Sequence, residues 1–97
     1  MCGLAGFSFS HPFNDSTQWL QDACQRLSHR GPDGSGYFED ISSGIGLAHT
    51  RLSIQDLSSS GHQPMQSLDK TVCLVFNGEL YNFRELRDEL IDQGFSF

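Results

Sequence analysis

The longest unbroken apolar stretch of the sequence runs from Val72 to Phe76 and is followed at once by Asn77-Gly78. A short continuous run of strand-forming side chains is typical of a strand that is buried on both faces. Asn-Gly favours a tight turn in which two consecutive residues take positive φ, so we expect this buried strand to end sharply. The stretch is far shorter than the roughly 20 apolar residues that a membrane helix requires, which excludes a membrane span.

A first helix is expected to begin near Asp15, because Asp15 and Gln18 have the spacing of a capping box. Gly31-Pro32 supplies the signal for its end. Between these limits the apolar side chains recur at helical spacing and form one face, which consists of Trp19, Leu20, Ala23, Cys24 and Leu27.

A second helix has the clearest boundaries in the sequence. Asn82 is the expected N-cap, Glu85 stands three residues later, and Gly94 is the expected stop. Tyr81 and Leu86 have the spacing of a hydrophobic staple. The face that we expect to be buried consists of Phe83, Leu86, Leu90 and Ile91.

Strands are expected in most of the remaining sequence. Residues 1–9 mix apolar and small side chains, which suits a buried strand that starts at the N-terminus itself. Residues 36–38 and 45–52 are separated by a Ser-Ser-Gly turn and predict an antiparallel pair. Residues 54–67 predict a long polar loop, which more often than average binds a ligand or packs on another domain. Residues 95–97 alternate as the start of a further strand would.

Length, charge and cysteine usage narrow the class of protein. A chain of 97 residues holds one small domain at most, or part of a larger one. Its formal charge of -6 leaves too few cations to meet nucleic acid or an anionic membrane, so neither is an expected partner. No signal-peptide pattern opens the sequence, so we expect a cytoplasmic, reducing location without disulfides. Neither the cysteines nor the histidines have the spacing of a metal site.

Cys2 is the first candidate for chemistry. Removal of Met1 would leave a thiol and a free α-amine on one residue, and an α-amine pKa of about 7.7 to 8.0 suits a base near neutral pH. The other interpretation is that a cysteine at this position is incidental at a frayed end. The strand expected to follow favours the catalytic interpretation, because it would hold the terminus in place.

Asn77-Gly78 and Arg51 are the other candidates. The Asn77 carboxamide and the next backbone N–H can point at one oxygen and form an oxyanion hole, although a plain hairpin turn is the commoner meaning of Asn-Gly. Arg51 is a cation within an apolar strand, where it either captures a carboxylate through two hydrogen bonds or is solvated at the strand end. The residues alone leave both pairs of alternatives open.

Five segments together resemble the class II glutamine amidotransferase domain of the glutamine-hydrolysing asparagine synthetase family. They are MCGLAGF at the start, HRGPDG at residues 29–34, HTRLSI at 49–54, GHQPM at 61–65 and FNGELYNFRELR at 76–87. Their order is that of the family, and they extend over nearly the whole chain. The Pro-Asp and Leu-Ser-Ile within them favour this branch over other class II amidotransferases.

The resemblance implies a role for each matching residue. Cys2 would be the nucleophile with its α-amine as the base, and the Asn77 side chain and Gly78 N–H would form the oxyanion hole. Arg51 would hold the α-carboxylate of glutamine, and Glu79 would help to bind its α-amino group. The glutamine pocket would also be lined by Leu52, Ser53, Ile54 and Gln55.

The resemblance also implies the fold and the partners. The fold would be α+β, namely the αββα sandwich of the N-terminal nucleophile hydrolases, of which residues 1–97 would form the first half only. Ammonia would pass to a synthetase domain of the same protein, which would bind ATP and Mg²⁺ and amidate aspartate to asparagine. No cofactor and no metal are expected within residues 1–97, and a homodimer of the full-length protein is left open.

Two departures from the family leave alternatives open. The family's domain is longer than this sequence, so a truncated domain is expected, and Gln55 stands where an aliphatic residue is usual. The acceptor of ammonia is open between aspartate, a sugar acid and a peptide. A non-catalytic glutamine-binding module and a fragment that cannot fold alone are the alternatives to an enzyme.

Overall fold

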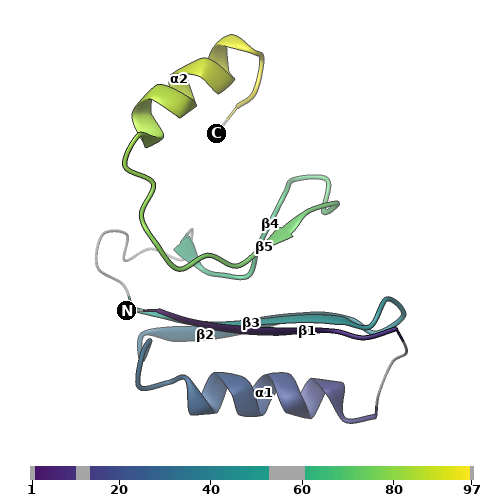
Figure 1. Ribbon diagram of the computed structural model, residues 1–97. Coiled ribbons are helices and arrows are strands. Elements are labelled where there is room, and N and C mark those ends of the chain that lie inside the picture. Colours follow the sequence, from purple (N-terminus) through teal and green to yellow (C-terminus); the bar gives the residue numbers. More distant parts are fainter. Residues whose placement is uncertain (1, 11–13, 53–60, 97) are drawn as a thin grey trace.

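The computed structural model describes residues 2–10, 14–52 and 61–96 (Figure 1). Helices and strands both occur, which confirms the α+β class. Within the described ranges, neither helix has the length and apolar content that crossing a bilayer would require. The elements in chain order are β1 (Gly3–Ser8), α1 (Ser16–Arg26), β2 (Gly34–Asp40), β3 (Ile45–Arg51), β4 (Met65–Gln66), β5 (Cys73–Leu74) and α2 (Phe83–Asp92).

The main sheet has β3 in its centre, with β1 and β2 antiparallel on either side. β2 and β3 pair in a register that places Gly34 opposite Arg51. Residues 41–44 join the two strands, and Gly44 takes a φ of 67° there while its carbonyl accepts the Phe9 N–H at 2.8 Å. The predicted antiparallel pair and its Ser-Ser-Gly turn are therefore confirmed.

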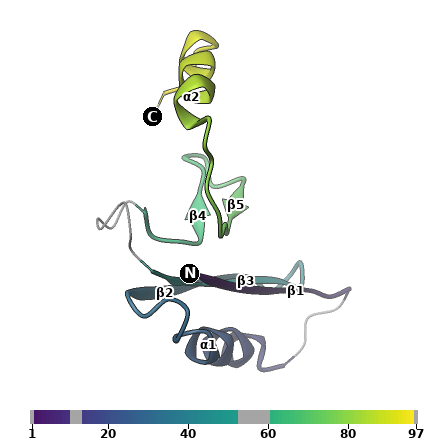
Figure 2. The same cartoon turned by 60° about the vertical axis from the view of Figure 1, so that its left-hand side comes forward.

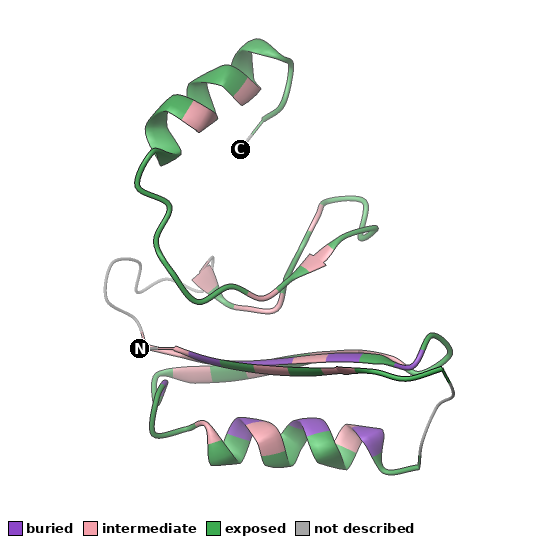
Figure 3. Cartoon of the chain, in the orientation of Figure 1, coloured by how far each residue is buried: buried purple, intermediate pink, exposed green. Residues whose placement is uncertain are grey.

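α1 covers one face of this sheet and closes a small core (Figure 3). Leu20 and Ala48 have no exposed surface, and Cys24 is buried beside them. Phe7 packs against this core from β1, and its ring meets Trp19 edge-on with 5.3 Å between the ring centroids. The predicted apolar helix face is confirmed at Leu20 and Cys24, whereas Trp19 remains 41% exposed at its margin.

The β4–β5 ribbon lies on the opposite face of the sheet from α1, as Figures 1 and 2 both show. β4 and β5 are antiparallel, with Met65 opposite Leu74. The chain before β4 approaches the sheet closely at Gly36, where a Cβ atom would lie 2.5 Å from the Gln63 carbonyl oxygen. The described residues therefore form a helix layer, a sheet layer and a short ribbon above the sheet.

The buried strand predicted at residues 72–76 is wrong. Only Cys73–Leu74 pair as β5, and Leu74 remains 52% exposed. A continuous apolar run is buried only when both of its faces are covered, and the described residues do not supply that cover. Neither Asn77 nor Gly78 takes positive φ, so the chain continues toward α2 instead of reversing in a hairpin turn.

β1 and α2 are also more exposed than predicted. β1 alternates, with Phe7 toward α1 and Leu4 45% exposed, so it is buried on one face only. No residue of α2 is buried, which contradicts the predicted burial of Phe83, Leu86, Leu90 and Ile91. The radius of gyration is 15.1 Å, larger than the roughly 13 Å of a compact domain of this length, because α2 stands away from the sheet (Figure 1).

The N-terminal ends of the helices differ from the predicted capping. Asp15 and Asn82 precede α1 and α2, but neither side chain makes a capping hydrogen bond. Asp15 has a φ of 67°, whereas a side chain that caps a helix belongs to a residue in the β region. The predicted staple between Tyr81 and Leu86 is also wrong, because Tyr81 is 91% exposed.

The C-terminal end of α2 is as predicted. Gly94 takes a φ of 96°, and its N–H donates to the Ile91 carbonyl at 3.0 Å. The Phe95 N–H donates to the Leu90 carbonyl at 2.9 Å, which completes a Schellman motif. The strand predicted at residues 95–97 is absent at 95–96, and residue 97 lies outside the described part of the chain.

Candidate active site

Cys2 lies at one end of the sheet, immediately before β1 and beside the end of β3. The Leu52 N–H donates to Cys2 Sγ at 3.3 Å, and Sγ lies 3.8 Å from the Leu52 carbonyl oxygen. The Arg30 side chain donates through Nε to the Cys2 carbonyl at 3.3 Å. Cys2 is half-buried, so its thiol is held in place while part of the residue faces solvent. These contacts show that Cys2 is not part of a frayed end.

Arg51 occupies the same end of the sheet. It is the last residue of β3 and is half-buried, and its carbonyl accepts the Asp33 N–H at 2.9 Å. The antiparallel register pairs Gly3 with Thr50, which brings the start of β1 beside the end of β3. A guanidinium-bearing residue and a thiol are therefore carried by adjacent strand ends.

The HRGPDG segment, residues 29–34, packs against this end of the sheet. A Cβ atom on Gly31 would lie 2.4 Å from the backbone carbon of Thr50, so only glycine allows this close approach. The Thr50 hydroxyl donates to the Leu27 carbonyl at 3.0 Å, which ties β3 to the end of α1. The sequence indicated only a turn here, whereas the structure shows that the segment supports the strand ends that carry Cys2 and Arg51.

Asn77, Gly78 and Glu79 lie on the exposed segment between β5 and α2. Gly78 and Glu79 line an open hollow of about 460 Å³ together with the start of α2. Figures 1 and 2 both show this segment on the face of the sheet opposite α1, above the end at which the chain begins. The structure thus brings Cys2, Arg51 and Leu52 together and leaves residues 77–79 on a separate segment. Ser53, Ile54 and Gln55 lie outside the described residues.

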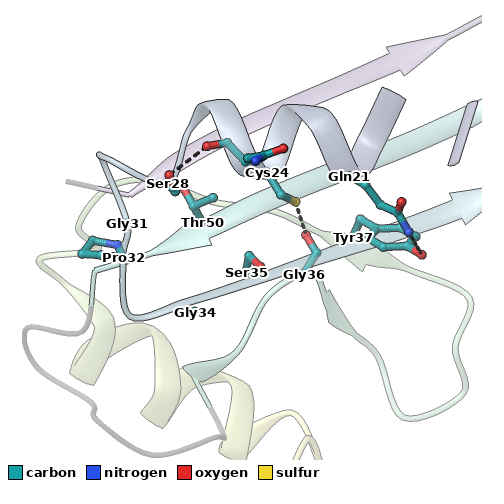
Figure 4. A pocket seen from close by; sticks show the side chains of 11 residues that line it. Gln21, Cys24, Ser28, Gly31, Pro32, Gly34, Ser35, Gly36, Tyr37 and Thr50 are labelled. Carbon is teal, nitrogen blue, oxygen red and sulfur yellow. Dashed lines mark hydrogen bonds between the residues drawn. The ribbon is translucent and has the colours of Figure 1, made fainter. Parts of the chain in front are cut away.

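A larger hollow of about 520 Å³ opens between α1 and β2 (Figure 4). The Cys24 thiol donates to the Gly36 carbonyl at 3.5 Å within it. None of the predicted site residues that the structure describes lines this hollow, whose walls are formed by Gln21, Cys24, Gln25, Ser28, Gly31, Pro32, Gly34, Ser35, Gly36, Tyr37 and Thr50. The described ranges contain no group of His, Cys, Asp or Glu side chains that could hold a metal ion.

His49 is a residue of β3 that the sequence did not connect with the site. It is 1% exposed, and its Nε2 atom has no hydrogen-bond partner. Burial lowers the pKa of His49 below its usual value, hydrogen bonding to the Phe76 backbone opposes this shift, and the charges of His62 and Arg51 lower the pKa further. The neutral imidazole is therefore favoured between the sheet and residue 76.

The lowered pKa of His49 predicts a loss of stability in acid. Because the folded pKa lies below the unfolded value near 6.5, the stabilisation is complete above that value and is lost as the pH falls through the folded pKa. The protection factors of β3 amides, which correct hydrogen exchange for its intrinsic pH dependence, should therefore fall more in the wild type than in His49→Gln when the pH is lowered from about 7 to about 5. His29→Gln, which removes an exposed histidine, is the control and should behave like the wild type. Equal acid sensitivity in His49→Gln would contradict the prediction.

Comparison with known proteins adds to this geometry. A family model described as a glutamine amidotransferase domain matches residues 1–97. The chain is 42% identical over 100 residues to asparagine synthetase [glutamine-hydrolyzing] 1 of Bacillus subtilis, in a match that covers all of this chain and 15% of the relative. It is 40% identical over 96 residues to asparagine synthetase [glutamine-hydrolyzing] 1 of Arabidopsis thaliana, covering 98% and 16% of the two chains. The amidase chyE of Penicillium rubens is 38% identical over 104 residues, covering 96% and 15%. The chain thus spans about 15% of the length of these relatives.

Proposed function

Because the chain belongs to the glutamine amidotransferase domain family, we propose that it hydrolyses glutamine to glutamate and ammonia with Cys2 as the nucleophile. The position of Cys2 is the observation that carries this proposal. Its thiol is held by Leu52 at the end of the sheet where Arg51 also lies, and a thiol beside a guanidinium-bearing residue supports the proposed pairing of a nucleophile with a group that binds a carboxylate.

The reaction would use groups that the chain itself supplies. Once Met1 is removed, the α-amine of Cys2 accepts the thiol proton, and the thiolate attacks the carboxamide carbon of glutamine. The Asn77 side chain and the Gly78 N–H donate to the oxyanion that forms. The α-ammonium returns its proton to the departing ammonia, which leaves a thioester on Cys2. Water then hydrolyses the thioester to glutamate and restores the thiol.

The same proposal assigns substrate contacts. Arg51 would bind the α-carboxylate of glutamine, and Glu79 its α-amino group. Leu52 would line the pocket together with Ser53, Ile54 and Gln55. For residues 77–79 to reach the thiol, the segment between β5 and α2 must lie over the Cys2 end of the sheet, and the arrangement in Figures 1 and 2 supports this.

We further propose that residues 1–97 form the first part of an αββα sandwich and supply ammonia for an amidation elsewhere in the protein. Aspartate is the acceptor we favour, because several similar proteins are asparagine synthetases. ATP and Mg²⁺ would then bind outside these residues. The similarity to the amidase chyE keeps a different acceptor, a sugar acid or a peptide, as the second candidate.

Titration calorimetry with glutamine tests the proposed activity on the complete gene product, meaning these residues with whatever the gene encodes beyond them. Continuous heat of turnover with release of glutamate and ammonia would support the enzyme. Saturable binding without turnover would contradict it and would indicate a glutamine-binding module.

Arg51→Lys should raise the KM for glutamine about ten- to a hundredfold with a smaller change in kcat. Lysine keeps the charge but loses the two parallel hydrogen bonds that a guanidinium makes with a carboxylate, and such bonds contribute about 1.5 to 3 kcal/mol. Arg26→Lys, on the exposed side of α1, is the matched control and should leave KM unchanged. An unchanged KM in Arg51→Lys would remove Arg51 from the substrate site.

A further inference from the structure

The side chain of Gln63 binds the backbone of Phe76, the residue immediately before Asn77-Gly78. The Phe76 N–H donates to Gln63 Oε1 at 2.6 Å, and Gln63 Nε2 donates to the Phe76 carbonyl at 3.2 Å. One carboxamide therefore meets both backbone polar groups of one residue, as a neighbouring strand would. Gln63 belongs to the GHQPM segment, for which the sequence indicated no more than a turn.

The backbone that carries Gln63 rests directly on the sheet. A Cβ atom on Gly36 would lie 2.5 Å from the Gln63 carbonyl oxygen and 2.7 Å from His62 Nε2, so the absence of a side chain at Gly36 permits this contact. Gly36 pairs with His49 of β3. β3 is also the strand whose end carries Arg51 and lies beside Cys2. Gln63 thus connects residue 76 to the sheet that holds the thiol.

Apolar packing contributes little to holding this segment. Phe76 is 46% exposed, and Leu80 further along is 54% exposed. The Phe76 backbone is held instead by its two hydrogen bonds to Gln63. Polar contacts to the Phe76 backbone therefore do more than side-chain burial to set where the next residues lie.

We propose that Gln63 is a positioning residue for glutamine hydrolysis, which places Asn77 and Gly78 so that their donors reach the oxyanion formed at Cys2. This inference rests on the function proposed above. An oxyanion hole lowers the barrier only when its donors are placed where the charge develops, so a small displacement of residue 76 reduces turnover more than ground-state binding.

The chemistry of the contact accounts for the residue type. Asparagine is one methylene shorter and cannot span the same distance to both groups. Ionised glutamate accepts the Phe76 N–H but cannot donate to the Phe76 carbonyl, whereas protonated glutamic acid can do both. Leucine keeps a similar volume and makes neither bond.

The test compares Gln63→Glu, Gln63→Asn and Gln63→Leu with the wild type in the complete gene product. We expect kcat for glutamine hydrolysis to fall about ten- to a hundredfold in all three near neutral pH, with KM changed by less than about threefold. The affinity for glutamate γ-semialdehyde, an aldehyde to which the thiol adds to form a tetrahedral adduct, should fall by a similar factor. Gln66→Glu in β4, whose side chain is exposed, is the control and should match the wild type.

The pH profile of Gln63→Glu supplies a readout that loss of stability would not produce. Its kcat relative to the wild type should rise as the pH falls and the new carboxyl group becomes protonated, because both bonds to Phe76 then form again. Gln63→Leu should show no such rise. Gln63→Glu is nearly isosteric with glutamine, so it remains informative if Gln63→Leu fails to fold.

The possible results separate this inference from the proposed function. If the wild type does not hydrolyse glutamine, or if Cys2→Ala still does, both are wrong. If the wild type hydrolyses glutamine through Cys2 but the Gln63 variants keep kcat and aldehyde affinity, the positioning role alone is wrong. The positioning role alone is also wrong if kcat and KM of the Gln63 variants change together and the kcat of Gln63→Glu relative to the wild type does not depend on pH.

Discussion

In the complete gene product, Cys2→Ala should lower the rate of the proposed amidation about a thousandfold or more when glutamine is the nitrogen source. The rate of amidation with added ammonia should not change. The alanine removes the thiol that is proposed to form the thioester, whereas ammonia supplied from solution bypasses that step. The measurement is product formation with glutamine or with an ammonium salt as the nitrogen source. Iodoacetamide should alkylate Cys2 in the wild type. The alkylated protein should lose product formation from glutamine and keep product formation from the ammonium salt.

Cys73→Ala is the matched control for this experiment. Burial raises the pKa of the Cys73 thiol, which disfavours the thiolate, and Cys73 lies in β5, which belongs to the two-stranded ribbon and not to the sheet that holds Cys2. The Cys73→Ala variant should keep product formation from glutamine and from ammonia. Equal loss of both activities in Cys2→Ala would contradict the assignment, as would an active enzyme in which N-terminal sequencing finds Met1 still present.

Asn77→Ala should lower kcat for glutamine hydrolysis about a hundred- to a thousandfold with little change in KM. The carboxamide is expected to donate to the oxyanion of the tetrahedral intermediate, and removal of one such donor typically has this effect. Steady-state kinetics of glutamate release measures it. Alkylation of Cys2 by iodoacetamide should proceed at the wild-type rate in this variant, because that reaction forms no oxyanion on the substrate carbonyl.

Asn82→Ala is the control for the second experiment. Asn82 also lies on the chain leading into α2 and is exposed, but its side chain makes no capping hydrogen bond. Its replacement should leave kcat and KM unchanged. A raised KM with unaltered kcat in Asn77→Ala would show that Asn77 binds glutamine without stabilising the transition state.

The pattern of correct and incorrect expectations about the fold has a physical cause. The face of α1 that carries Leu20 and Cys24, the antiparallel pair β2–β3 and the stop at Gly94 were predicted, because each depends on residues within a few positions of one another. The burial of residues 72–76 and of the apolar face of α2 was predicted wrongly. Burial of an apolar side chain is favourable, but it occurs only where another layer of the structure covers that side chain.

Only part of the candidate site could likewise be predicted from the sequence. Cys2, Arg51 and Asn77-Gly78 could be singled out because each residue type brings its own chemistry, and their catalytic roles stay predictions. The supports around them could not be found from the sequence. Gly31 against Thr50 and Gln63 on Phe76 are contacts between segments that are distant in the chain.

The sequence by itself therefore determined the local units of this protein, the family to which it belongs and the residue types available for hydrolysis, since periodicity, glycine positions and motifs are properties of short stretches of chain. Only the tertiary structure decided that the Cys2 thiol meets Leu52 at the end of β3 and that a glutamine from a polar loop binds the backbone before Asn77. These contacts depend on how the helix, the sheet and the ribbon stack. A hydrogen bond between a side chain and the backbone of a distant segment leaves no local pattern in either segment that would predict it.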